Sequence, residues 1–286
     1  MSCPPPSPPN CQTSASQTST HWLALMVGNS RLHWGWFNQS TLLLAWDTPH
    51  FADEAIATLV QHQLNPPPHW RADLSWPLAI GDCSSPPLWL ASVVPHQTQR
   101  WAAYHPSHIL TLDQIPLKNL YDTFGIDRAL ALCGARQQVG FPALVIDGGT
   151  ALTLTAADGD DHLVGGAILP GLQLQLRSLS QSTASLPPVS LPSFETLPNR
   201  WATDTPAAIQ SGVVHTVLAG LRDFIDAWWN QWPTGAVVLT GGDGPFLAHH
   251  LHRCFGQRSH LLYESPHLVI LGIGEVRARQ KAPGDF

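Results

Sequence analysis

LVIDGGTALTLTAAD, residues 144–158, runs an apolar strand into Asp147, two glycines and Thr150, and then resumes an alternating strand at once. Glycine allows a ligand to approach the backbone, and the unpaired N–H groups of such a turn can face phosphate oxygens. A carboxylate beside them suits a cation that bridges to the phosphates. The other interpretation is an ordinary hairpin turn in which the aspartate hydrogen-bonds to its own backbone.

A second unit of the same layout precedes this one, HWLALMVGNSRLHWGWF at residues 21–37. Its turn, Gly28-Asn29-Ser30, stands where Gly149-Thr150-Ala151 stands in the later unit, which indicates an old duplication. A third glycine-rich turn, TGGDG at residues 240–244, follows another buried strand pattern. Three such loops on one scaffold fit a nucleotide held between two lobes, and none matches the GxxxxGK[ST] pattern of a P-loop.

The rest of the chain alternates strand and helix patterns, which is typical of an α/β fold. A long amphipathic helix is predicted from Thr205 and Pro206, which suit the N-cap and first turn, and the apolar run at 268–280 is predicted to enter a last helix. We expect three parts: a disordered Pro/Ser-rich tail at 1–20, an N-terminal lobe at 21–124 with the first loop, and a C-terminal lobe at 125–286 with the other two.

The composition argues against several classes of protein. A formal charge of -6 and only 14 basic residues do not suit a protein that neutralises nucleic-acid phosphates. No apolar run approaches the ~20 residues needed to cross a bilayer, so no membrane is expected. Five scattered cysteines without a CxxC pair, and an opening without Lys or Arg, indicate a reduced, cytoplasmic protein. The low charged fraction of 12% favours self-association.

The many histidines and tryptophans receive no chemical role. The 15 histidines include HHLHR at residues 249–253, but no metal-ligand spacing is present. Trp228, Trp229 and Trp232 on the predicted long helix are interpreted as packing residues or a dimer face.

GIDR at residues 125–128 carries the best candidate for contact with a substrate hydroxyl. Phosphoryl transfer asks for positioning, charge stabilisation and a carboxylate that accepts the hydroxyl proton, and Asp127 offers one. Arg128 could hold an anionic oxygen with its planar fork. The alternative is that Asp127 only caps the N–H groups of its own helix.

Taken together, these motifs resemble the type III pantothenate kinases, members of the acetate and sugar kinase, heat-shock ATPase and actin superfamily. The resemblance covers nearly everything from Leu23 to Glu275. It is carried by GIDR, DGGTALT, GGAILPG followed by TASLP, TPAAIQSGV and the TGG of residues 240–242, in this order. It implies a two-lobed, duplicated RNase H-like (actin/hexokinase-like ATPase) fold with mixed sheets flanked by helices.

The activity implied by the resemblance is ATP-dependent phosphorylation of pantothenate, the first step to coenzyme A, by a homodimer that uses Mg²⁺ and a monovalent cation (K⁺ or NH₄⁺). Asp127 matches the family's proton acceptor, and Asp147 matches its monovalent-cation ligand. The positions that match ATP contacts are Gly28, Asn29, Ser30, Arg31, Gly149 and Thr150. The positions that match pantothenate contacts are Tyr121, Gly125, Ile126, Arg128 and Thr205.

Two departures from the family pattern bear on this hypothesis. The first phosphate loop of the family reads DxGN[ST], but here Met26 stands in place of the aspartate, and thioether sulfur is a poor ligand for a hard cation such as Mg²⁺. The segment LKNLYDTFG before GIDR also lacks the family's Asn-Pro pair. Met26 motivates one alternative, a catalytically weak relative with a binding or regulatory role in transcription. The other alternative is a kinase of the same fold that acts on a different small hydroxylated substrate.

Overall fold

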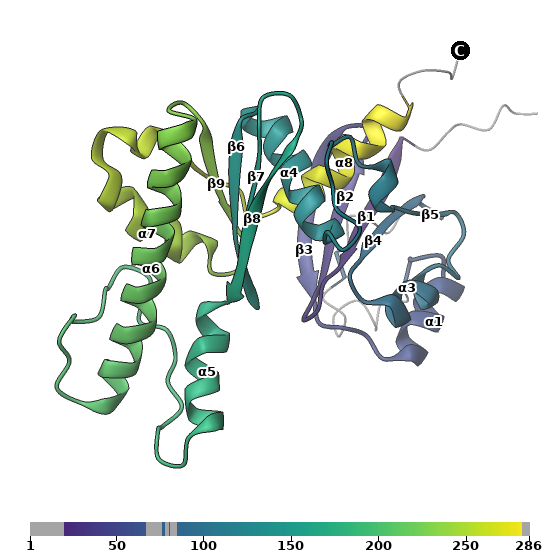
Figure 1. Cartoon of the computed structure of the whole chain (residues 1–286). Coiled ribbons are helices and arrows are strands. Elements are labelled where there is room, and N and C mark those ends of the chain that lie inside the picture. Colours follow the sequence, from purple (N-terminus) through teal and green to yellow (C-terminus); the bar gives the residue numbers. More distant parts are fainter. Residues whose placement is uncertain (1–19, 67–75, 78–79, 81–84, 282–286) are drawn as a thin grey trace, which may run out of the picture.

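The computed structural model describes residues 20–66, 76–77, 80 and 85–281, and it consists of two five-stranded mixed sheets with helices between and around them (Figure 1). The predicted tail at 1–20 lies, apart from Thr20, outside the described residues. In the first sheet the spatial order is β3-β2-β1-β4-β5. Its strands are β1 His21–Val27, β2 Leu32–Asn38, β3 Thr41–Thr48, β4 Leu88–Ser92 and β5 Ser107–Ile109.

The second sheet repeats the first. Its order is β10-β9-β6-β7-β8, with strands β6 Ala143–Gly148, β7 Ala151–Ala157, β8 Leu163–Pro170, β9 Ala236–Thr240 and β10 Leu262–Glu264. In both sheets the first three strands along the chain form an antiparallel meander, and the last two add in parallel on the other side. The predicted α/β class and the duplicated layout are confirmed.

The helices follow the predicted pattern with two corrections. The α-helices are α1 Asp53–Gln61, α3 Pro95–Trp101, α4 Ile126–Val139, α5 Leu172–Ser182, α6 Thr205–Gln231, α7 Gly244–Phe255 and α8 Leu268–Lys281, and two 3₁₀ helices are η2 Leu112–Gln114 and η3 Gly256–Leu261. The N-cap of α6 is Asp204, not Thr205, because the Asp204 carboxylate accepts the Ala207 N–H at 2.9 Å. The apolar run at 268–280 is helical from its first residue, since it packs between α4 and the face of the first sheet rather than as a strand within a sheet.

A central layer made of α4 and α8 separates the two sheets (Figure 1). α8 packs on the first sheet and α4 contacts the second, and one buried cluster joins both helices with strands of both sheets. The two helix backbones nearly touch: a Cβ at Gly134 would overlap the Leu268 carbonyl oxygen, and a Cβ at Gly272 would overlap that of Leu130. α8 thus covers the first sheet although it lies in the segment 125–286, and the lobe boundary at 124/125 stays a prediction.

Each sheet also has a core on its outer face. The first outer core contains Trp34 stacked on Trp46, with Trp76 and Trp101 edge-on to Trp34. The second packs α6 and α7 on strands β6 and β9. Trp228 and Trp229 of α6 are buried there, and the Trp228 ring contacts that of Trp232 at a tilt of 32°, as a packing role predicts.

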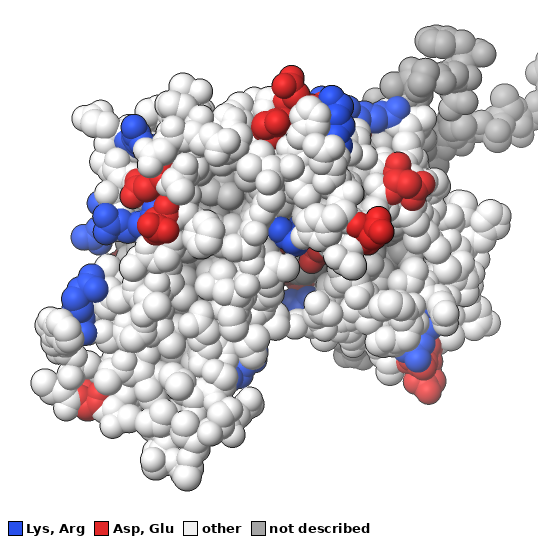
Figure 2. All heavy atoms as spheres, viewed as in Figure 1, with Lys and Arg blue, Asp and Glu red and all other residues white. Residues whose placement is uncertain are grey.

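The surface agrees with the sparse charge of the sequence. Figure 2 shows that basic and acidic side chains are scattered over one face of the molecule. The same view shows a recess between the two halves of the molecule. Among the described residues, no helix has the length and apolar character that crossing a bilayer requires. Cys133 and Cys254 carry free thiols.

Candidate functional site

The tips of the two glycine-containing hairpins meet. Ser30 Oγ and Thr150 Oγ1 are 2.8 Å apart, although 120 residues separate them in the sequence. Each tip is a tight turn, closed by Gly28 N–H donating to the Arg31 carbonyl at 3.0 Å and by Gly149 N–H donating to the Ala151 carbonyl at 3.1 Å. Asn29, Ser30 and Thr150 are exposed, so their remaining polar groups are open to a ligand.

The third loop packs directly on the second. Gly241 has φ +82, and a Cβ at this position would overlap the Asp147 carboxylate and the Gly148 carbonyl, so both the backbone conformation and the space require glycine. Asp243 N–H donates to the Gly148 carbonyl at 2.8 Å. The structure therefore brings all three predicted loops together at one place between the sheets.

Acidic side chains gather where the loops meet. Burial, and next the charge of Asp127, raise the pKa of Asp147 to about 6, while the charge of His33 opposes them. Burial raises the pKa of Asp243 to about 6 as well. None of the ion pairs formed by the described residues involves Asp147. A half-buried carboxyl without an ion-pair partner fits a cation ligand, although the described residues contain no cluster of three His, Cys, Asp or Glu side chains that could hold a metal alone.

Asp127 lies in the first turn of α4, the helix between the two sheets. Its Oδ1 accepts the Arg128 N–H at 2.9 Å, and a Cβ at Gly125 would overlap the same carboxylate. Ile126, half-buried, packs against the central core and fixes the start of the helix. The Asp127 carboxylate is thus held near Asp147, close enough for its charge to affect the pKa of that residue.

Arg128 is buried and has no acidic partner among the described residues. Its guanidinium donates from Nε to Thr155 Oγ1 at 2.9 Å, from Nη1 to the Tyr121 hydroxyl at 3.0 Å and from Nη2 to the Leu154 carbonyl at 3.4 Å. It also lies over the Phe124 ring, 4.7 Å from the centroid. Three of its five N–H groups are therefore used within the protein, and one of them orients Tyr121.

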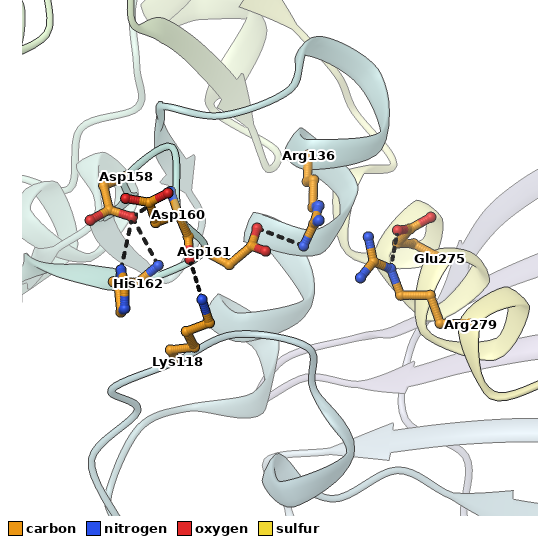
Figure 3. Close-up of polar contacts among 8 residues, drawn as sticks. All are labelled: Lys118, Arg136, Asp158, Asp160, Asp161, His162, Glu275 and Arg279. Carbon is orange, nitrogen blue, oxygen red and sulfur yellow. Dashed lines mark hydrogen bonds and ion pairs between the residues drawn. The ribbon is translucent and has the colours of Figure 1, made fainter.

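Tyr121 lies at a cavity of about 500 Å³ formed by residues 112–122. The segment that carries it is fastened to the β7–β8 hairpin (Figure 3). Lys118 N–H donates to the Asp161 carbonyl at 2.8 Å, and Lys118 Nζ donates to the Asp160 carbonyl at 2.9 Å. Arg136 of α4 in turn forms an ion pair with Asp161, with 2.6 Å between Nη1 and Oδ1. The two groups are close, but their geometry is not that of a hydrogen bond. The hairpin thus links α4 to the segment that leads to Tyr121.

Thr205 lies apart from the other predicted residues. It lines a cavity of about 820 Å³ between α5 and α6, together with Gln175, Asp204 and Thr216. No residue of the glycine loops or of α4 lines this cavity. Within one chain, the cavity that Thr205 lines is therefore not lined by Asp127.

Met26 offers no ligand oxygen to the first loop. Its side chain is 2% exposed and belongs to the central core. The polar residues beside that loop are His33 and, through it, Asp47 of β3, and sequence reasoning missed both. The alternating pattern of residues 32–38 places His33 on the same face as Met26, which was the available signal.

Two sheets of one topology, with glycine-containing loops meeting between them, define the actin- and hexokinase-like fold class. The similarity to two solved structures supports this fold: a Baf family protein from Campylobacter jejuni (TM-score 0.58, 17% identity, covering 90% of this chain and 98% of that one) and the ethanolamine utilization protein EutJ from Carboxydothermus hydrogenoformans (TM-score 0.50, 13% identity, covering 95% and 92%).

Sequence comparison identifies the family. Residues 22–227 match the family model described as type III pantothenate kinase. A type III pantothenate kinase from Nostoc sp. is 45% identical over 271 residues, which cover 93% of this chain and 98% of the relative. One from Synechocystis sp. is 48% identical over 226 residues, which cover 79% of each. The chain belongs to the type III pantothenate kinase family.

Proposed function

We propose that this chain phosphorylates pantothenate with ATP to give 4'-phosphopantothenate, the first step of coenzyme A biosynthesis. The observation that carries the proposal is the contact between Ser30 and Thr150, which brings the two hairpin tips together within reach of the acidic groups Asp127 and Asp147. In this proposal the tips, with Arg31 beside the first, hold the phosphates of ATP through exposed backbone and hydroxyl groups.

Asp127 accepts the proton of the pantothenate hydroxyl as that oxygen attacks the terminal phosphorus of ATP, and the bond from this phosphorus to the oxygen of the leaving ADP breaks. A carboxylate in this role contributes by correct placement, and the fixed first turn of α4 supplies it. Gly125, Ile126, Arg128 and Tyr121 line the acceptor side. The two N–H groups that Arg128 does not use within the protein are the candidates for an anionic oxygen of pantothenate.

Asp147 is the proposed ligand of a monovalent cation, since it is half-buried at the loops and has no ion-pair partner among the described residues. Mg²⁺, when bound with ATP, would neutralise phosphate charge, and Asp147 is the carboxylate at the loops that would hold it. Equal rates in sodium-only and potassium buffers would contradict the role of Asp147.

The proposed assembly is a cytoplasmic homodimer in which Thr205 of one subunit contacts pantothenate bound to the other. Its support is the separation of Thr205 from Asp127 within one chain, and the exposed apolar residues Val164 and Ile168 on strand β8. Light scattering measures the mass. Mixing two inactive variants, Asp127→Asn and a Thr205 variant, should restore activity if each site uses both chains, because the mixed dimer has one intact site.

A coupled assay of ADP release with pantothenate tests the activity. Turnover that depends on pantothenate supports the kinase. A folded dimer that binds ATP without turnover would instead favour a binding or regulatory protein, the alternative that Met26 motivates. ADP release with another hydroxylated acceptor, and none with pantothenate, would reassign the substrate.

A further inference from the structure

A histidine–aspartate pair lies beside the first glycine loop. His33 of β2 and Asp47 of β3 are directly opposite in the sheet register, and His33 Nδ1 is 2.8 Å from Asp47 Oδ1. The two side chains are 42% and 44% exposed, so the pair is open to a ligand rather than part of the core. Met26 is opposite His33 on the other side, so the three residues form a row across one face of the sheet.

The free nitrogen of the His33 ring points to the loop. A Cβ built at Gly28 would lie 3.5 Å from His33 Nε2 and 3.7 Å from Cδ2. Since Nδ1 is used by Asp47, Nε2 is the ring atom left for a ligand, and it has no hydrogen bond among the described residues. It therefore lies at the loop whose tip contacts Thr150.

Charged groups lie around the pair. Partial burial works to raise the pKa of Asp47, but the hydrogen bond and charge of His33, with smaller effects of Arg31 and His267, lower it overall. Asp147 also interacts with His33. With Nδ1–H donated to Asp47, the ring offers a donor at Nε2 only as the imidazolium.

We propose that His33 donates a hydrogen bond from Nε2 to the terminal phosphates of ATP and that Asp47 positions the His33 ring. The His33 side chain then compensates phosphate charge at the first loop, where Met26 stands in place of the family's aspartate. The inference rests on the proposed use of ATP, and it deepens that function by assigning a phosphate contact. A charge-assisted hydrogen bond of this type compensates phosphate charge directly.

The test compares His33→Gln, Asp47→Asn and the control His62→Gln, which changes an exposed histidine at the end of α1. Calorimetry measures the Kd of ATP and of adenosine. For His33→Gln we expect ATP to bind about 10- to 100-fold more weakly, the usual effect of losing a hydrogen bond to a charged group, and adenosine to bind as before. For Asp47→Asn we expect the KM of ATP to rise and the KM of pantothenate to stay constant, a split that a general loss of folding would not give.

NMR of the unmodified protein gives a second measurement that needs no variant. The His33 ring signals should shift when ATP is added and not when adenosine is added. Unchanged signals with ATP, or an ATP affinity of folded His33→Gln within about 2-fold of the parent, would overturn the proposal. ATP binding that depends on His33 in a protein without pantothenate turnover would support this inference while contradicting the proposed function.

Discussion

Asp127 is the residue on which the proposed chemistry depends. Asp127→Asn keeps the size of the side chain and an oxygen that can accept the Arg128 N–H, but removes the proton acceptor. We expect turnover to fall by about 10²- to 10⁴-fold, the usual contribution of a general base, with the Kd of ATP nearly unchanged. The ADP-release assay and calorimetry measure the two quantities.

Asp223→Asn, at an exposed position of α6, is the control for this change and should behave like the parent. A wild-type rate for Asp127→Asn would show that another group accepts the proton. An equal loss of ATP binding and turnover would place Asp127 at the nucleotide instead.

Asp243 makes the stability of the ligand-free protein depend on pH. Its pKa of about 6 in the folded chain is above the ordinary 3.8, so the folded state binds the proton more tightly than the unfolded state. This contribution is fully present below pH 3.8 and is lost as the pH rises through about 6. Asp243→Asn should therefore raise the free energy of unfolding at about pH 7.5 by about 1 kcal/mol, a value reduced for the partial solvent exposure of the group, and change it little at about pH 4.5.

Urea unfolding at the two pH values measures this difference. The same effect of Asp243→Asn at both values would mean that the carboxyl titrates normally in the folded protein. Asp223→Asn again serves as the control, because it makes the same change at an exposed position of α6.

At the scale of elements, the β7–β8 hairpin fixes the segment that carries Tyr121. Arg136→Gln removes the ion pair with Asp161, whose side chains are only 26% and 27% exposed, and loosens the residues that follow Lys118. We expect the KM of pantothenate to rise about 5-fold, equivalent to about 1 kcal/mol, with the KM of ATP unchanged.

Arg279→Gln is the matched control for the hairpin, because it removes an ion pair with Glu275 within α8 (Figure 3). It should leave both KM values unchanged. A rise in the KM of ATP in Arg136→Gln would show that the hairpin supports the whole site rather than the acceptor side.

The elements were predictable to different degrees. The strands that enter the glycine loops were predictable, because a short apolar run that ends in glycine can be recognised from a few consecutive residues. The structure confirms the strands predicted within residues 21–37 and 144–158. β3 was not predicted, since its exposed apolar residues Leu43 and Leu44 do not alternate. The His33–Asp47 pair could not be predicted without β3, because its partners meet only through strand pairing.

At the scale of the whole molecule, the close crossing of α4 and α8 joins the two halves. A Cβ at Gly272 would overlap the backbone oxygen of Leu130, which cannot move without shifting α4. Gly272→Ala should lower the free energy of unfolding by about 1 to 3 kcal/mol, as overpacking does. The loss should appear in one unfolding transition, because a single buried cluster contains strands of both sheets.

Gly220→Ala is the control for Gly272→Ala, because the same substitution should here raise the free energy of unfolding. Gly220 lies on an exposed part of α6 with nothing within 4 Å of the added Cβ, so alanine should stabilise the helix by about 0.5 to 1 kcal/mol. Denaturant unfolding measures the free energy of unfolding of both variants. Similar effects at the two positions would mean that α4 and α8 can move apart without loss of stability.

The place of α8 also has a consequence for biosynthesis. The ribosome delivers residues 268–281 after both sheets, yet this helix covers a face of β1, one of the first strands to emerge. That apolar face of the nascent polypeptide stays open to water and to chaperones until residues 268–281 emerge. The first sheet can therefore complete its core only after residues 268–281 emerge, however early residues 21–124 leave the ribosome.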